Sequence, residues 1–156
     1  MKVDIYSREA IEKLIETSFP SNVAVISFSD PLGKRTPKDY VPVDYKGKCE
    51  NLFRIAVHDI DIEILEDYGM TFDTYLPEVD ELAKFIDSSV RKGLDIICQC
   101  EYGQSRSAAC AAAIKEFYDH SGISIFADYR YYPNQLIFNK ILNALKKQEE
   151  NETKFN

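Results

Sequence analysis

The 156-residue sequence contains no tryptophan, only two histidines and only six glycines. The two histidines, His58 and His120, have no cysteine–histidine spacing typical of a zinc site, so the sequence predicts neither a metal nor an organic cofactor. The glycine content and the absence of a repeat exclude collagen-like and low-complexity chains. These absences leave an ordinary folded domain.

Long apolar runs are also missing, since none approaches the roughly 18 residues needed to cross a bilayer. The opening MKVDIYSREA lacks the basic and apolar regions of a signal peptide. We therefore expect a cytoplasmic protein without membrane association. In such a protein the four cysteines, at positions 49, 98, 100 and 110, are expected to be free thiols.

The net charge of −7 reflects an excess of carboxylates. It argues against nucleic-acid or anionic-membrane partners, because such partners favour clustered lysine and arginine. A phosphorylated substrate is still compatible with this charge, since salt screens exposed charges over roughly 8 Å and a local pocket of donors can bind phosphate.

Hydrophobic periodicity predicts one domain over residues 1–147, followed by a charged, disordered tail at 148–156. Apolar or alternating runs predict strands at 2–6, 23–28, 52–57 and 94–98. Helical spacing predicts helices from Ser7 to Glu16, from a cap at Asp73 or Thr74 to Lys92, and over 105–118 and 133–147. Residues 34–50 are expected to form a surface loop, and 58–73 an acidic loop with one helical turn near 63–68.

Strands that alternate with helices predict a three-layer α/β fold with a mainly parallel sheet. Ligand sites in such folds lie beyond the carboxyl ends of the strands. Cys100 follows the most continuously apolar strand directly, so it is expected to lie at such a position.

The segment Cys100–Ser107 joins that strand to the predicted helix 105–118 by a short turn. A turn of this kind directs backbone N–H groups and the positive end of the helix dipole at one point, which favours an oxyanion. Arg106 adds a planar fork of donors that can bind two phosphate oxygens at once. The same positive surroundings would stabilise a thiolate at Cys100.

Cysteine, five residues, arginine and then serine, with glycine third after the cysteine, resembles the phosphate loop of protein tyrosine and dual-specificity phosphatases. Four further stretches are similar to a compact bacterial branch of predicted tyrosine phosphatases: Ser7-Arg8-Glu9-Ala10, Ser29-Asp30-Pro31, Val57-His58-Asp59-Ile60 and Pro133-Asn134. The resemblance covers most of the chain.

The resemblance implies hydrolysis of phosphate monoesters, chiefly protein phosphotyrosine or small aryl phosphates, through a phosphocysteine intermediate. It implies that Cys100 is the nucleophile, that Arg106 binds the phosphoryl group, and that Ser107 supports the cysteine sulfur as it leaves. The phosphate cradle would be formed by the amides of Glu101, Tyr102, Gly103, Gln104, Ser105 and Arg106.

The family's general acid comes from the loop after the preceding strand, which here offers Asp59, Asp61, Asp67 and Asp73. We favour Asp59, because it follows the strand directly as the family's acid does.

One departure from the family pattern is Gln99, since most members carry histidine before the nucleophile. It motivates an alternative function, a catalytically silent phosphate-binding module. A third option is a thiol redox enzyme that uses Cys98 and Cys100, although two cysteines on one strand strain a disulfide. In the purely structural alternatives, Cys100 is a buried hydrophobic residue and Arg106 forms an ion pair with an acidic loop. Cys98 and Cys110 are expected to be core residues.

Overall fold

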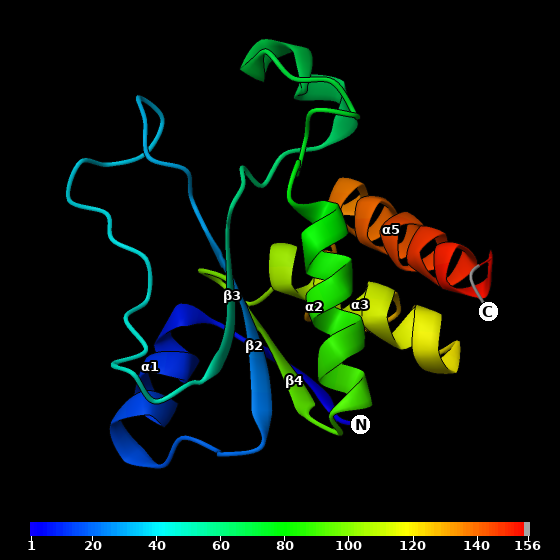
Figure 1. Ribbon diagram of the computed structural model, residues 1–156. Helices are drawn as coiled ribbons and strands as arrows, with labels where there is room; N and C mark the ends of the chain where they lie inside the picture. Colours follow the sequence, from blue (N-terminus) through cyan, green and yellow to red (C-terminus); the bar gives the residue numbers. More distant parts are fainter. Residues whose placement is uncertain (155–156) are drawn as a thin grey trace.

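The computed structural model describes residues 1–154 (Figure 1). The elements follow one another as β1 (Val3–Tyr6), α1 (Arg8–Thr17), β2 (Val23–Ser29), β3 (Asn51–Ala56), the short 3-10 turns η1 (Ile62–Ile64) and η2 (Glu66–Tyr68), α2 (Val79–Arg91), β4 (Asp95–Gln99), α3 (Arg106–Asp119), α4 (Ile123–Phe126) and α5 (Gln135–Lys154). In this part of the chain no helix is both long enough and apolar enough to cross a membrane.

The four strands form one parallel sheet in the order β1-β4-β2-β3. Strand β4 lies between β1 and β2, so that Cys98 is level with Ile5 on one side and with Ile26 on the other. Because all strands run the same way, their carboxyl ends meet at one edge, where the segments after β2, β3 and β4 gather (Figure 1). The predicted α/β fold with a mainly parallel sheet is confirmed.

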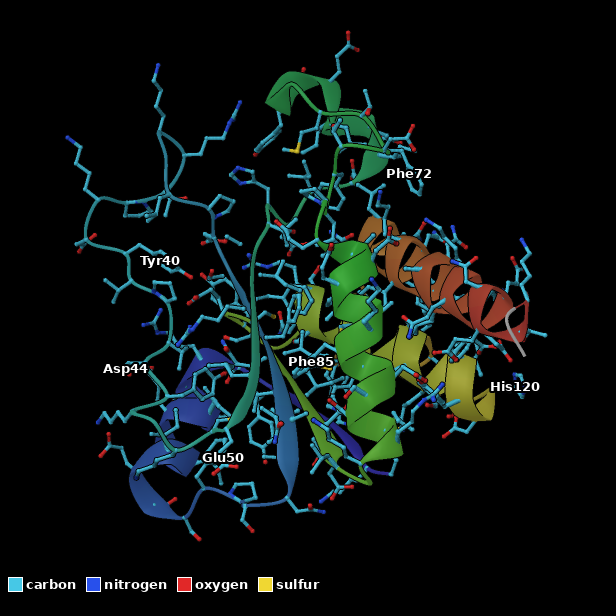
Figure 2. The ribbon with its side chains drawn as sticks, viewed as in Figure 1. Tyr40, Asp44, Glu50, Phe72, Phe85 and His120 are labelled. Atoms are coloured by element: carbon cyan, nitrogen blue, oxygen red, sulfur yellow. The ribbon has the colours of Figure 1, made fainter. Side chains whose placement is uncertain are left out.

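Two hydrophobic cores lie on the two faces of the sheet, as a three-layer arrangement requires. The larger core joins the sheet to α2, α3 and α5, with Phe85 of α2 packed against Phe53 of β3 (Figure 2). The smaller core joins the sheet to α1 through Ile11 and Ile15. Ser7 caps α1 as predicted, since its side chain accepts a hydrogen bond from the Ala10 amide.

The segment 34–50 is a loop, but it is not only a surface loop as predicted. Val43 and Tyr45 are buried in the smaller core, where they pack with residues of α1 and β2. The absence of a regular period hid this burial, because two inward side chains in an irregular segment leave no periodic signal.

The helix predicted over 74–92 begins five residues later, at Val79. Thr74 forms hydrogen bonds with Thr71 in a turn instead of capping a helix, and Leu76 adopts a left-handed φ of 56° that a helix cannot contain. Leu76 is nevertheless buried. Its place in the apolar pattern therefore reflected burial and not helical structure.

The final helix α5 continues to Lys154, beyond the predicted end at Lys147 and through most of the predicted tail 148–156, whose last two residues lie outside the described part. Ion pairs join this end to α2, from Arg91 to Glu152 at 2.6 Å and from Lys147 to Asp80 at 3.4 Å. Glu152 of the predicted tail is therefore an ion partner of a neighbouring helix, and the segment around it is helical.

Candidate active site

The segment between β4 and α3 turns sharply at Gly103, whose φ is 68°. A Cβ atom at this position would lie 2.7 Å from the backbone nitrogen of Ser7, closer than any side chain tolerates. Glycine is therefore required twice at this point, for its backbone conformation and for the close approach of the β1–α1 junction.

The carbonyl groups of the same segment are bonded to its surroundings. Glu101, Gln104 and Ser105 accept hydrogen bonds from the amides of Arg8, Tyr132 and Asn134 at 3.0, 2.8 and 3.2 Å. Within the described residues, by contrast, the N–H groups from Glu101 to Arg106 donate to no protein acceptor. These three carbonyls are thus held by neighbours while the amide donors of the loop stay free, as an oxyanion site needs.

The thiol of Cys100 is buried at the start of this loop, and its Sγ lies 3.0 Å from the hydroxyl oxygen of Ser107 in the first turn of α3. Both side chains are packed in the larger core or at its boundary. The predicted nucleophile and its predicted hydroxyl partner are therefore in contact.

Arg106 opens α3 and has a side chain that is 5% exposed. Its Nη1 donates to Asp30 Oδ1 at 2.7 Å and to the Val57 carbonyl at 2.9 Å. Its Nε is buried and has no hydrogen-bond partner among the described residues. One end of the guanidinium is anchored to the protein, and the edge that carries Nε retains an unused donor.

Asp30 was not among the predicted site residues, although it follows β2 directly. Strands β2 and β4 are neighbours in the parallel sheet, so the residues after them meet at the same edge. The Ser29-Asp30-Pro31 turn could have indicated this position only once the strand order was known.

Gln99, which stands where most family members have histidine, is fully buried at the end of β4. Its Oε1 accepts hydrogen bonds from the hydroxyls of Ser27 and Tyr45 at 2.5 and 2.8 Å, and its Nε2 donates to the Cys100 carbonyl at 3.0 Å. Burial raises the pKa of Tyr45 to about 12, so this hydroxyl stays protonated and able to donate. An uncharged amide therefore supports the Cys100 peptide.

Tyr40 lies on the long segment after β2 (Figure 2) and forms a hydrogen bond with the side chain of Glu101 in the phosphate loop. Its hydroxyl donates to Glu101 Oε1 at 2.5 Å and accepts from the Asp30 amide at 3.1 Å, while Arg8 lies 3.4 Å from the same carboxylate oxygen. Burial, followed by the bond to Glu101, raises the pKa of Tyr40 to about 12. The Glu101 side chain is thus held by neutral and cationic donors.

The favoured acid, Asp59, is exposed and lies beside the phosphate loop. Its Oδ1 accepts hydrogen bonds from Ser105 Oγ at 2.7 Å and from Asn134 Nδ2 at 2.8 Å. It also lines a cleft of about 560 Å³ between the acidic loop and the start of α5. Asn134 belongs to one of the stretches that resemble the family, and no sequence pattern predicts its contact with the acid.

The three other candidate acids have no hydrogen bond to the phosphate loop in the described structure. Asp61 accepts from the amide of Glu63 and caps η1, and the Asp67 carbonyl accepts from Arg35. The Asp73 carbonyl accepts a hydrogen bond from the Lys140 side chain. Of the four aspartates, Asp59 is the one that the structure brings to the loop.

The remaining cysteines are free thiols, as Cys100 is. Cys98 and Cys110 are fully buried in the larger core, as the sequence analysis expected of core residues. Burial, together with a hydrogen bond to Cys110, raises the pKa of Cys98 well above its usual range.

Comparison with known proteins finds similarity at the level of structure. No family model matches the sequence, and no curated protein matches it. Among solved structures, the human tyrosine phosphatase-like serine/threonine/tyrosine-interacting protein is 15% identical with a TM-score of 0.52, and the alignment covers 94% of this chain and 87% of that one. PTPMT1 is 13% identical with a TM-score of 0.55, covering 98% and 95%.

A third solved structure is a mouse putative dual specificity phosphatase complexed with zinc tungstate, which is 17% identical with a TM-score of 0.53 and coverages of 96% and 86%. At these identities the likeness concerns the fold. The chain has the fold of the tyrosine and dual-specificity phosphatases, which the sequence resemblance predicted.

Proposed function

We propose that this protein is a cysteine-dependent phosphatase that hydrolyses phosphate monoesters through a phosphocysteine intermediate. The observation that carries the proposal is the convergence of the Cys100 thiol, the unpartnered Nε of Arg106 and the free amides of Glu101–Arg106 on one loop. A nucleophile and an anion-binding site are thereby parts of the same short segment.

In the first step the Cys100 thiolate attacks phosphorus, a sulfur–phosphorus bond forms, and the bond from phosphorus to the ester oxygen breaks. Asp59 gives its proton to that departing oxygen. In the second step the Asp59 carboxylate takes a proton from water as the water oxygen attacks phosphorus. The sulfur then leaves as a thiolate, to which the Ser107 hydroxyl, 3.0 Å away, can donate.

Arg106 would stabilise the charge on the transferring phosphoryl group. Asp30 and the Val57 carbonyl hold Nη1, so the guanidinium does not have to be reoriented when the phosphate arrives. Preorganised donors of this kind are worth on the order of 10² to 10³ in rate for each donor removed.

We propose protein phosphotyrosine or another aryl phosphate as the substrate. The segments after β2 and β3 both extend beyond the carboxyl edge of the sheet (Figure 1). Arg35 joins them, because its guanidinium lies 4.0 Å from the centre of the Tyr68 ring and donates to the Asp67 carbonyl. Segments that extend beyond the loop in this way favour a long aryl ester over a short alkyl one.

A second candidate function is a silent phosphate-binding module. Gln99 in place of histidine favours it, and one of the structural neighbours is itself described as phosphatase-like. Such a module would keep the amides and Arg106 and would bind phosphate without turnover.

The deciding experiment is hydrolysis of para-nitrophenyl phosphate between pH 5 and 8, with EDTA and a reductant present. Cys100→Ser should lower the rate on the order of 10⁴-fold or more, because the nucleophile acts as one unit with its surroundings. Cys49→Ser is the matched control, since Cys49 is a half-buried free thiol before β3. No turnover by the parent chain, with tungstate still bound, would favour the silent module.

A further inference from the structure

We propose that Asn134 is a positioning residue for the general acid: it holds the Asp59 carboxylate against the phosphate loop, and so controls protonation of the leaving group. This inference rests on the proposed function. It concerns a residue that has no hydrogen bond to the nucleophile or to Arg106 in the described structure.

The side-chain amide nitrogen of Asn134 gives both of its hydrogens to the segment that carries the acid, Asp59 and Ile60. Nδ2 donates to Asp59 Oδ1 at 2.8 Å and to the Ile60 carbonyl at 2.9 Å, which uses both of its hydrogens. Asn134 is 8% exposed, whereas Asp59 is an exposed residue on a long loop. The buried residue is therefore the fixed partner, and the acid is the group being held.

The other polar groups of Asn134 anchor it to the scaffold. Its Oδ1 accepts from the Ile137 amide at 2.9 Å, which caps the first turn of α5, and its backbone N–H donates to the Ser105 carbonyl at 3.2 Å. One side chain thus joins a helix, the phosphate loop and the acid segment. This requires a donor and an acceptor at opposite ends of one group, which a side-chain amide provides.

The arrangement also distinguishes the two oxygens of Asp59. Both donors, Ser105 Oγ and Asn134 Nδ2, bind Oδ1, while Oδ2 has no hydrogen-bond partner among the described residues. A proton on this carboxyl therefore belongs on Oδ2, the oxygen left free to deliver it. Fixing the orientation matters, because a catalytic group misplaced by about 1 Å can cost on the order of 10² in rate.

Two substitutions separate this role from helix capping. Asn134→Ser and Asn134→Asp both keep an oxygen that can cap α5, since serine, aspartate and asparagine are similar caps. Neither can donate two hydrogen bonds to the acid segment. Asn143→Ser is the matched control, because Asn143 lies on the same helix, is exposed and does not line the cleft that contains Asp59.

The experiment compares kcat/KM for para-nitrophenyl phosphate, a good leaving group, with kcat/KM for phenyl phosphate, a poor one, because this parameter reports the step in which the leaving group departs. Asp59→Ala is the reference and should slow phenyl phosphate far more than the nitrophenyl ester. We expect Asn134→Ser to change the ratio of the two rates in the same direction, by about 10-fold. The Asn143→Ser ratio should equal that of the parent.

Equal slowing of both esters by a folded Asn134→Ser or Asn134→Asp chain would overturn the inference, as would loss of folding in both variants, because each assigns Asn134 a structural role only. If the parent hydrolyses both esters and Cys100→Ser does not, but the ratio is unchanged at Asn134, the proposed function stands and this inference fails. If the parent hydrolyses neither ester, both fail.

Discussion

The two sides of the site are built in different ways. The nucleophile side, Cys100–Arg106, is short and lies between a strand and a helix, and neighbouring amides bond the carbonyls of Glu101, Gln104 and Ser105. The acid side, residues 57–78, is long and mostly exposed, and Asp59 is held there by two side-chain hydrogen bonds. A thiolate and its anion trap must be rigid to act, whereas an acid needs only one well-placed oxygen.

This difference predicts that changes on the nucleophile side affect stability and rate together, or rate for every substrate. Changes on the acid side should affect rate selectively, with little cost in stability. Four experiments test the contrast.

Arg106→Lys should have the largest effect, with a loss of kcat on the order of 10²- to 10³-fold for good and poor leaving groups alike. A lysine has one ammonium group and cannot stay bound to Asp30 and Val57 while also presenting a planar pair of donors. Steady-state rates with both esters measure this, and Arg54→Lys on β3 is the control. A loss below tenfold would contradict the assigned clamp.

Gly103→Ala and Gly69→Ala form a matched pair across the two sides, since their φ angles are 68° and 70°. Both substitutions should lower the free energy of unfolding by about 1–2 kcal/mol, because alanine is strained in the left-handed backbone conformation. Only Gly103 also meets Ser7 at 2.7 Å, and nothing lies within 4 Å of a Cβ at Gly69. Urea unfolding should therefore show a clearly larger loss for Gly103→Ala, accompanied by a lower rate. Equal losses would mean that the β1–α1 contact yields easily.

Gln99→Leu should destabilise the protein by about 1–3 kcal/mol, because it leaves the buried hydroxyls of Ser27 and Tyr45 without their acceptor. Adding Tyr45→Phe should recover part of that loss, since the second orphaned hydroxyl is then absent. A denaturant-based double-mutant cycle measures this coupling. Strict additivity of the two changes would show that the hydroxyl finds another partner.

Asp61→Asn should have the smallest effect, within about twofold for phenyl phosphate, because its carboxylate caps η1 and has no bond to the phosphate loop. The same holds for Asp67→Asn, whose contact to Arg35 runs through the backbone carbonyl. Slowing at Asp61 that matches Asp59→Ala would move the acid role to Asp61.

The sequence predicts the nucleophile side of the site better than the acid side. Strand, turn, glycine, arginine and serine are contiguous from Cys100 to Ser107, so local pattern and spacing located the phosphate loop. Asp30 and Asn134 depend on which strands are neighbours and on where α5 begins, and no single segment contains that information. Asp59 was favoured by its position after a strand, and its contacts with Ser105 and Asn134 required the folded chain.

In the fold, the errors occurred where tertiary packing prevailed over local pattern. Leu76 is apolar at helical spacing but lies in a buried turn, and Tyr45 is buried within an irregular loop. The last turns of α5 have the charge of a disordered tail, yet they are helical, and Glu152 pairs with Arg91 on α2. Ion partners from another helix cannot be read from the segment itself.

The contact of Gly103 with Ser7 also bears on the order of folding. Strand β1 pairs with β4, and Val3 is level with Ile96. The two paired strands are thus more than ninety residues apart in the sequence. Such distant pairings form slowly, because the intervening chain loses entropy before the contact repays it. The phosphate loop packs against the β1–α1 junction, which is fixed only when this pairing forms. We therefore expect regain of phosphate binding during refolding to lag behind formation of the helices.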